Sequence, residues 1–214
     1  MNLALFGATG TAGLLLVEKA LAAGHYVTVY ARNPSKLAIQ HERLRVVRGE
    51  LNNMAAIDKT VQGQDAVISL LGPAGAKSTH QPLTLGMTCI VAAMKRFGVR
   101  RLIATSTPSA EDPVDRFALS FRLAVWLIRK LSLESYEDIV GAAKVVRSSG
   151  LDWTLVRLPM LTNKVSVSPP ACDYLGSPGI RLFWLSRNVL TDFLLSQLND
   201  SAWLRKAPVL SNRA

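Results

Sequence analysis

The feature that most constrains this chain is a glycine-rich turn between its first apolar run and its first helical pattern. The run Asn2 to Phe6 is short and apolar, as a buried parallel strand requires, and GATGTAG follows it directly at residues 7–13. Apolar residues then recur at helical spacing from Thr11 to Ala23, and Gly24 stops that helix. A strand, a turn of this kind and a helix, in this order, are typical of a dinucleotide-binding βαβ unit.

This glycine loop suits the diphosphate of a dinucleotide for physical reasons. Its glycines permit a tight turn, close approach of the backbone to the diphosphate, and close packing of the helix against the strand. The helix N-terminus adds unpaired N–H groups and a partial positive charge. A turn with a purely structural role is the alternative. We expect the loop to bind the cofactor through Gly7, Thr9, Gly10, Thr11, Ala12 and Gly13.

The end of the second predicted strand, Tyr26 to Ala31, indicates which dinucleotide binds. An acidic residue there would bind the ribose 2′-hydroxyl of NAD, whereas arginine accommodates the 2′-phosphate of NADP. The following segment has no carboxylate; it has Arg32, which can contact a phosphate in a planar, bidentate way, with Asn33 and Lys36 as further donors. The sequence therefore predicts NADP(H) rather than NAD(H). The alternative is that Arg32 is only a surface residue.

The rest of the chain repeats the alternation of apolar runs with helical patterns, which predicts right-handed βαβ units and an α/β, Rossmann-type, doubly wound parallel sheet. Further strands are predicted at Leu44 to Val47, Asp65 to Leu71, Leu102 to Thr105, Trp153 to Arg157 and Ile180 to Leu185, and further helices at Asn53 to Val61, Pro82 to Phe97, Val114 to Leu131, Leu133 to Ser148 and Asn188 to Leu198, with a short helix opened by Pro34. We expect one domain over residues 1–214, with the substrate-side loops and helices mainly in 106–185.

Other strand ends face the same crevice, because ligands of such sheets lie beyond the carboxyl ends of the strands. We expect Glu50 and Leu51 near the adenine, and Leu70, Leu71 and Gly72 under the nicotinamide-side ribose. Thr105 and Pro159, at the ends of later strands, complete the expected cofactor-binding set.

Composition and charge are those of a globular protein with a basic surface. Hydrophobic residues make up 49% of the 214 residues, and the net charge is +10. The densest basic cluster is Lys95, Arg96, Arg100 and Arg101, for which a solvated surface and a contact with a partner or a membrane surface both remain open. Recognisable nucleic-acid-binding motifs are absent, so we expect no nucleic-acid partner.

The chain carries no pattern of a secreted or membrane-spanning protein. The first residues lack the basic region of a signal peptide, and the apolar stretch from Phe117 to Leu133 is interrupted by three cations, so we expect a cytoplasmic protein without a membrane span. Cys89 and Cys172 read as free thiols. No His or Cys stands at ligand spacing, so no metal site is expected.

Several motifs together resemble the atypical short-chain dehydrogenase/reductases, and within them the NmrA-like and biliverdin reductase B (flavin reductase) types. They are GATGTAG at residues 7–13, ARNPSKL at 31–37, GQDAVISLLG at 63–72 and SSGLDWTLVRLP at 148–159. The resemblance extends to about Leu198. It implies a Rossmann fold, NADP(H) binding and, in many members, reduction of flavins or related conjugated acceptors. By this similarity Ser106 corresponds to the hydroxyl that faces nicotinamide and substrate; the alternative is that it only ends a strand.

The usual acid–base pair of short-chain dehydrogenases is missing. That pair is a tyrosine followed four residues later by a lysine, and none of the four tyrosines has a lysine at that spacing. Lys144 matches a lysine of the related helix, but Ile139 and Ala143 stand where many NmrA-like members have Lys and Glu. Glu137 and Asp138 could face solvent or the pocket, and we expect them to face solvent. Carbonyl reduction by the usual mechanism is therefore disfavoured.

Two functions remain after these observations. The first is an NADPH-dependent oxidoreductase that reduces a flavin, quinone or similar small molecule, with Ser106 as its catalytic group, acting as a monomer or homodimer. The second is a non-catalytic, NADP(H)-sensing regulator. The apolar stretch Phe117 to Ile128 is either a wall of the substrate pocket, a dimer face or a buried crossover helix.

Overall fold

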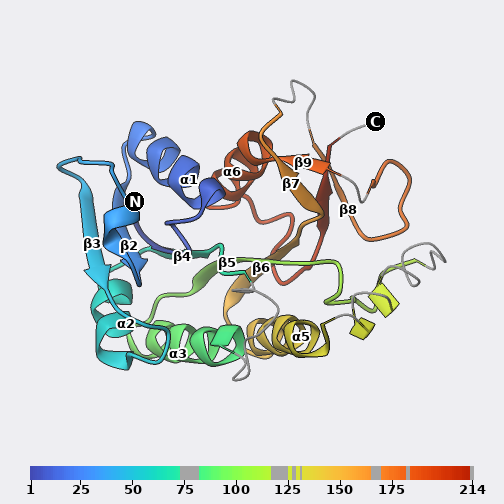
Figure 1. The fold of residues 1–214 in the computed structure, drawn as a ribbon, viewed down its shortest axis with the longest axis horizontal. Helices are drawn as coiled ribbons and strands as arrows, with labels where there is room; N and C mark the ends of the chain where they lie inside the picture. Colours follow the sequence, from blue (N-terminus) through green and yellow to red (C-terminus); the bar gives the residue numbers. More distant parts are fainter. Residues whose placement is uncertain are drawn as a thin grey trace.

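The structure is a computed structural model, which describes residues 1–72, 82–116, 125–126, 129–130, 132–164, 170–181 and 184–212. A central β-sheet is covered by helices on both faces (Figure 1). The strands of this sheet are β1 (Asn2–Phe6), β2 (Tyr26–Ala31), β3 (Leu44–Arg48), β4 (Ala66–Ser69), β5 (Arg101–Ser106), β6 (Asp152–Arg157), β8 (Ala171–Asp173) and β10 (Val209–Ser211). The helices are α1 (Thr11–Ala22), α2 (Met54–Val61), α3 (Pro82–Arg96), α5 (Leu133–Arg147) and α6 (Arg187–Ser196).

The strand order is β3-β2-β1-β4-β5-β6-β10-β8, and every pair is parallel except β10 with β8. The first six positions have the order of the dinucleotide-binding Rossmann fold. The order reverses between β1 and β4, so the loops that follow these two strands diverge at this point. Ligands of open α/β sheets bind in the crevice that such a reversal opens. The predicted fold class is confirmed.

The two faces of the sheet bury separate apolar cores because side chains alternate along each strand. In β1, Leu3 and Leu5 join the core beneath α1 and α6, whereas Ala4 and Phe6 join the core beneath α2, α3 and α5. Figure 1 shows these two helix layers on opposite sides of the strands. The carboxyl ends of the strands are thereby left open between the layers.

The C-terminal third departs most from the predictions. A separate pair of short parallel strands, β7 (Met160–Thr162) and β9 (Trp184–Ser186), lies beside α6. The strand predicted at Ile180 to Leu185 therefore begins later, at Trp184. Pro34 opens only one 3₁₀ turn, Pro34–Lys36. Apart from Val125, Trp126, Arg129 and Lys130, the predicted helix from Phe117 onwards lies outside the described residues.

The basic cluster is largely neutralised by its own neighbours. Arg96 pairs with Asp58, Arg100 pairs with Asp152, and Arg101 donates to the carbonyl of Gln197. Arg100 and Arg101 stand where β5 begins, at the edge of the sheet away from the glycine loop. This arrangement agrees with the solvated-surface interpretation. Across the described ranges, no helix is long and apolar enough to span a membrane.

Candidate functional site

The glycine loop is packed so tightly that two of its positions exclude any side chain. Gly7 has φ +78°, and a Cβ built on it would lie 2.6 Å from the carbonyl carbon of Leu70 at the end of β4. A Cβ on Gly13 would lie 2.4 Å from the carbonyl oxygen of Gly7, so this glycine lets α1 approach the loop. Gly10 differs, because the nearest atom to its added Cβ would be 3.6 Å away. The open space beside the loop is therefore at Gly10.

The N-terminus of α1 leaves its donors available at that space. Gly10 is the N-cap, in an extended conformation that provides no side-chain cap, and the first turn contains no acidic residue. The amides of the first turn thus have no capping side chain. Together with the positive end of the helix dipole they form a site for an anion such as a diphosphate.

Two cavities meet at this loop and form one crevice along the carboxyl ends of the strands. They have volumes of about 570 and 340 Å³. They share part of their lining, namely Gly7, Gly10, Leu70, Leu71, Gly72 and Leu83. The larger lies over β2 and β3, and the smaller over β5 and β6. A molecule that crosses the glycine loop would enter both.

The cavity over β2 and β3 brings together several residues that were expected to bind the cofactor. Its lining includes Thr9, Arg32, Glu50 and Leu51, as predicted, and also Tyr30. Arg32 is exposed at the end of β2. Asn33 and Lys36 do not line either cavity, and Asn33 Oδ1 accepts a hydrogen bond from Ser35 Oγ at 2.7 Å.

Tyr30 fixes the floor of this cavity and was missed by the sequence analysis. Its hydroxyl donates to the carbonyl of Glu50 at 2.6 Å. Burial, with Cys89 and Glu50 nearby, raises the pKa of Tyr30 to about 12, so the hydroxyl remains a donor at neutral pH. A Cβ on Gly49 would lie 2.3 Å from this oxygen, which explains why the turn after β3 has a glycine.

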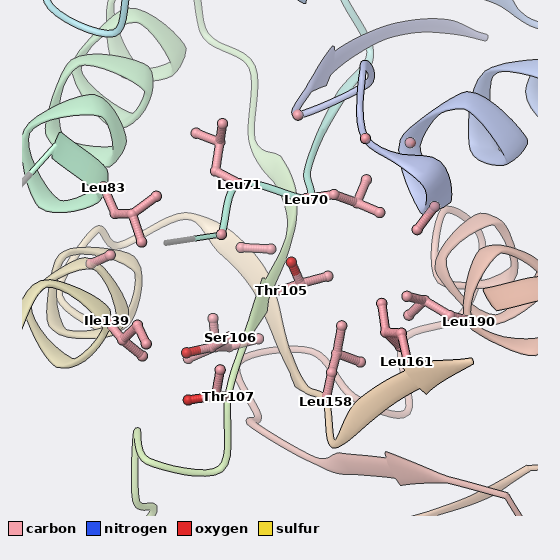
Figure 2. Close-up of a pocket in the computed structure, with 18 of the residues that line it drawn as sticks. Leu70, Leu71, Leu83, Thr105, Ser106, Thr107, Ile139, Leu158, Leu161 and Leu190 are labelled. Carbon is pink, nitrogen blue, oxygen red and sulfur yellow. The ribbon is translucent and has the colours of Figure 1, made fainter. Parts of the chain in front are cut away.

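The cavity over β5 and β6 is mostly apolar, and three of the hydroxyl side chains in its wall come from the end of β5 (Figure 2). Thr105, Ser106 and Thr107 follow one another at the end of β5. Thr105 Oγ1 donates to the carbonyl of Ser69 at 3.3 Å. Figure 2 shows the Ser106 and Thr107 oxygens pointing together toward α5 and Ile139. The predicted residues Thr11, Ala12, Gly13 and Pro159 also line this cavity.

One face of α5 closes the cavity without an acid or base. The lining residues of this helix are Ile139, Ala142, Ala143 and Val146. Lys144 is exposed and does not line the cavity. Among the described lining residues, Arg187 at the start of α6 is the only ionisable one; it donates to Asn163 Oδ1 at 2.7 Å. Proton transfer by a carboxylate, imidazole, phenol or lysine of these residues is thereby excluded.

Asp138 is not at the surface, and the prediction that it faces solvent was wrong. Its side chain is 3% exposed, and it accepts the backbone N–H groups of Leu83 and Thr84 at 3.0 and 2.8 Å. It therefore caps the N-terminus of α3 from the neighbouring helix α5. Glu137 is exposed, as predicted. The Asp138 carboxylate is committed to holding two helices together.

Some of the cavity-lining residues that were not predicted could have been found from the sequence. Residues 139, 142, 143 and 146 are spaced as one helix face, so a cavity on that side of α5 was within reach of the sequence. Leu83, Met87, Leu161, Arg187 and Leu190 had no such signal, because α3, β7 and α6 approach the cavity only through tertiary packing. 

Comparisons with known proteins place this geometry among nicotinamide-dependent proteins. A family model described as NAD(P)H-binding matches residues 7–201. The chain is 29% identical, over 76% of its length, to a (4-alkanoyl-5-oxo-2,5-dihydrofuran-3-yl)methyl phosphate reductase of Streptomyces griseus, of which it spans 49%. It is 32% identical over 54% of its length to a 2-alkyl-3-oxoalkanoate reductase of Stenotrophomonas maltophilia, of which it spans 37%. The chain thus covers about half or less of these relatives.

Solved structures share the fold over nearly the whole chain. A short-chain dehydrogenase/reductase of Veillonella parvula in complex with NADP has a TM-score of 0.79 at 23% identity, covering 99% of this chain and 94% of that one. ChuY, an anaerobilin reductase of Escherichia coli O157:H7, has a TM-score of 0.79 at 16% identity, with 99% and 97% covered. At these identities the likeness establishes the fold alone.

Proposed function

Since the chain belongs to the NAD(P)H-binding family, we propose that it is an NADPH-dependent reductase of the atypical short-chain dehydrogenase/reductase type, acting on a flavin, a quinone or a similar conjugated acceptor. One observation carries this proposal. The cavity beside the glycine loop has apolar walls, and the polar side chains at the end of β5 are neutral hydroxyls. Such a site suits an acceptor that needs orientation more than a strong acid.

The residues present fit the proposed cofactor. The space at Gly10 and the uncapped first turn of α1 would hold the diphosphate, and Arg32 would hold the 2′-phosphate that distinguishes NADPH from NADH. The shared lining formed by Leu70, Leu71 and Gly72 would support the ribose on the nicotinamide side. When bound, NADPH supplies the hydride that reduces the acceptor.

The protein's own part in the reaction is binding, orientation and exclusion of water. Apolar residues of α3, α5 and α6 pack around the acceptor and keep bulk water from its reacting face. The Ser106 hydroxyl donates a hydrogen bond to a heteroatom of the acceptor and so fixes its position. The acceptor gains a hydride, its conjugated system spreads the negative charge, and one proton from water completes the two-electron reduction.

The curated relatives support a reductase, because both are named reductases of small organic molecules. The substrates that appear in these names are those of the two relatives and are not part of the proposal for this chain. Among the described lining residues of its cavity, hydroxyl side chains and one cation, Arg187, could recognise an acceptor.

The decisive experiment is a fluorescence titration of the purified protein with NADPH and NADH, followed by addition of FMN, riboflavin or a quinone while the absorbance of the reduced nicotinamide is recorded. We expect tighter binding of NADPH than NADH and acceptor-dependent loss of absorbance. Binding without turnover would favour the second candidate, a sensor of NADP(H). The observation that supports this candidate is that the described lining residues contain no acid–base pair. Failure to bind either nucleotide would contradict both.

A further inference from the structure

Thr107 lies in the wall of the cavity over β5 and β6 and has an unsatisfied hydroxyl. Its Oγ1 atom is buried and has no hydrogen-bond partner among the described residues. Thr107 lines the same cavity as Ser106, and the two oxygens point to the same side in Figure 2. Ile139, toward which they point, offers no polar atom to either of them.

Backbone hydrogen bonds hold the loop that contains Thr107. The carbonyl of Thr107 accepts the N–H of Ala110 at 3.1 Å, so the residue lies within a hydrogen-bonded turn. The same loop is anchored where Arg157 and Arg147 both donate to the carbonyl of Ala110. Rotation of the loop is therefore not an easy way for Thr107 to reach a partner in the protein or in bulk water.

A buried hydroxyl without a partner carries a desolvation penalty, whereas a valine of the same shape would not. Thr105 provides the contrast two residues earlier, since its hydroxyl donates to the carbonyl of Ser69. A threonine at 107 is accounted for when a ligand in the cavity completes its hydrogen bonding. This cavity is the one in which, under the proposed function, the acceptor binds.

We propose that Thr107 is a specificity-determining residue whose hydroxyl bonds a polar atom of the acceptor beside the atom bonded by Ser106. The inference rests on the proposed function and narrows its substrate class. Two hydroxyls on consecutive residues, pointing the same way, match a flat conjugated molecule with two hydrogen-bonding atoms along one edge. The neighbouring ring nitrogen and carbonyl oxygen of an isoalloxazine have this arrangement. A para-quinone has its two carbonyls on opposite edges and can satisfy only one hydroxyl.

The test compares Thr107→Val, which keeps the shape and removes the hydroxyl, with Thr107→Ser, which keeps the hydroxyl. Quenching of riboflavin fluorescence in the presence of NADP⁺ gives the dissociation constant of riboflavin without turnover. We expect Thr107→Val to raise this constant about tenfold and Thr107→Ser to leave it within about twofold, with the dissociation constant of NADPH unchanged in both. The rate with the para-quinone menadione should fall less than the rate with riboflavin.

Thermal unfolding separates this role from a structural one. Thr107→Val should unfold at the wild-type temperature or above it, because an unsatisfied group is removed, whereas Thr105→Val should unfold at a lower temperature, because its hydroxyl has a partner. Unchanged riboflavin binding in Thr107→Val would overturn the inference, as would a loss of NADPH affinity or a failure of the wild type to bind riboflavin. Riboflavin binding that depends on Thr107 without any NADPH oxidation would retain the inference and reject the reductase.

Discussion

Arg157 and Asp115 form a buried, two-point ion pair that joins the end of β6 to the loop after β5. The distances are 2.5 Å from Nη1 to Oδ2 and 2.6 Å from Nη2 to Oδ1, and the Arg157 side chain is fully buried. Nε of Arg157 also donates to the carbonyl of Ala207, and Asp115 accepts the N–H of Leu175. One ion pair therefore connects four segments: the end of β6, the loop after β5, and the stretches around Leu175 and Ala207.

We predict that Asp115→Ala lowers the free energy of unfolding by about 3–5 kcal/mol, because it leaves the Arg157 guanidinium buried and unpaired. Urea unfolding followed by circular dichroism measures this change. Asp192→Ala is the matched control, since Asp192 pairs with Lys19 at an exposed site and should cost at most about 1 kcal/mol. Equal losses in both variants would contradict the structural role assigned to the buried pair.

The same carboxylate makes stability depend on acid. Burial alone would raise the pKa of Asp115, but hydrogen bonds from Arg157 and from backbone amides outweigh it and hold its pKa below the usual value of an aspartate. Because the pKa is lower in the folded state, the ionised Asp115 carboxylate adds to the free energy of unfolding above the pKa of the unfolded state, about 3.8. This stabilisation is lost as the pH falls through the folded-state pKa. In urea unfolding below pH 4, Asp115→Asn should show a shallower loss of stability than wild type. Parallel curves would contradict this assignment.

Arg32→Gln should convert the preference for NADPH into near indifference. A charge-assisted contact to phosphate contributes about 1.5–3 kcal/mol, so we expect the dissociation constant of NADPH to rise about 10- to 100-fold and that of NADH to change little. Arg45→Gln removes the same charge from an exposed position of β3, opposite Thr28 and away from the strand end, and should leave both constants unchanged. An equal loss for NADH would show that Arg32 does not bind the 2′-phosphate.

Substitutions at two glycines of the loop should have different effects, one on stability and the other on NADPH binding. Gly13→Ala places a methyl group 2.4 Å from the carbonyl oxygen of Gly7 and should destabilise the fold by about 1–3 kcal/mol or more. Gly10→Ala has room and an ordinary φ of −81°, so its stability should change by less than about 1 kcal/mol. Its methyl group occupies the space expected for the diphosphate, so NADPH binding should weaken at least about tenfold. Normal NADPH binding by Gly10→Ala would place the diphosphate elsewhere.

Ser106→Ala should reduce kcat/KM for the acceptor about tenfold, because one oriented hydrogen bond is lost, while the dissociation constant of NADPH stays constant. Steady-state NADPH oxidation and a parallel fluorescence titration measure the two quantities. Ser196→Ala is a suitable control, because that residue is exposed on α6, outside both cavities, and its hydroxyl bonds only near neighbours in the chain: it donates to the Phe193 carbonyl and accepts from Gln197 Nε2. If Ser106→Ala kept full activity, the hydroxyl would have no part in orienting the acceptor.

Local parts of this fold were predictable from sequence. The strand Asn2–Phe6, the glycine loop and the helix Thr11–Ala22 adjoin one another, so periodicity and turn chemistry sufficed. The short strands of the C-terminal third were not predictable in this way. Val209–Ser211 has three residues and becomes a strand only because it fits between β6 and β8, which belong to distant parts of the chain.

The candidate site likewise contains residues that could be predicted from the sequence and residues that could not. Residues at strand ends, such as Arg32 and Leu71, follow from topology and were named from the sequence, whereas Ser106 was named by its resemblance to the family. Asp138 could not be placed, because a carboxylate on a helix looks solvated until the N-terminus of another helix is known to lie against it. Arg187 belongs to the same class, since α6 reaches the cavity only through its packing on α1.

The positions of Ile139 and Ala143 on α5 have a consequence for the versatility of this scaffold. Both line the cavity, one helical turn apart, at the four-residue spacing that a tyrosine–lysine pair requires. At these two positions the helix therefore has hydrocarbon side chains, where that pair would have a phenol and an ammonium group. Both side chains are almost fully buried in the core between α3 and α5, so a larger polar pair at these positions would also require that core to be repacked.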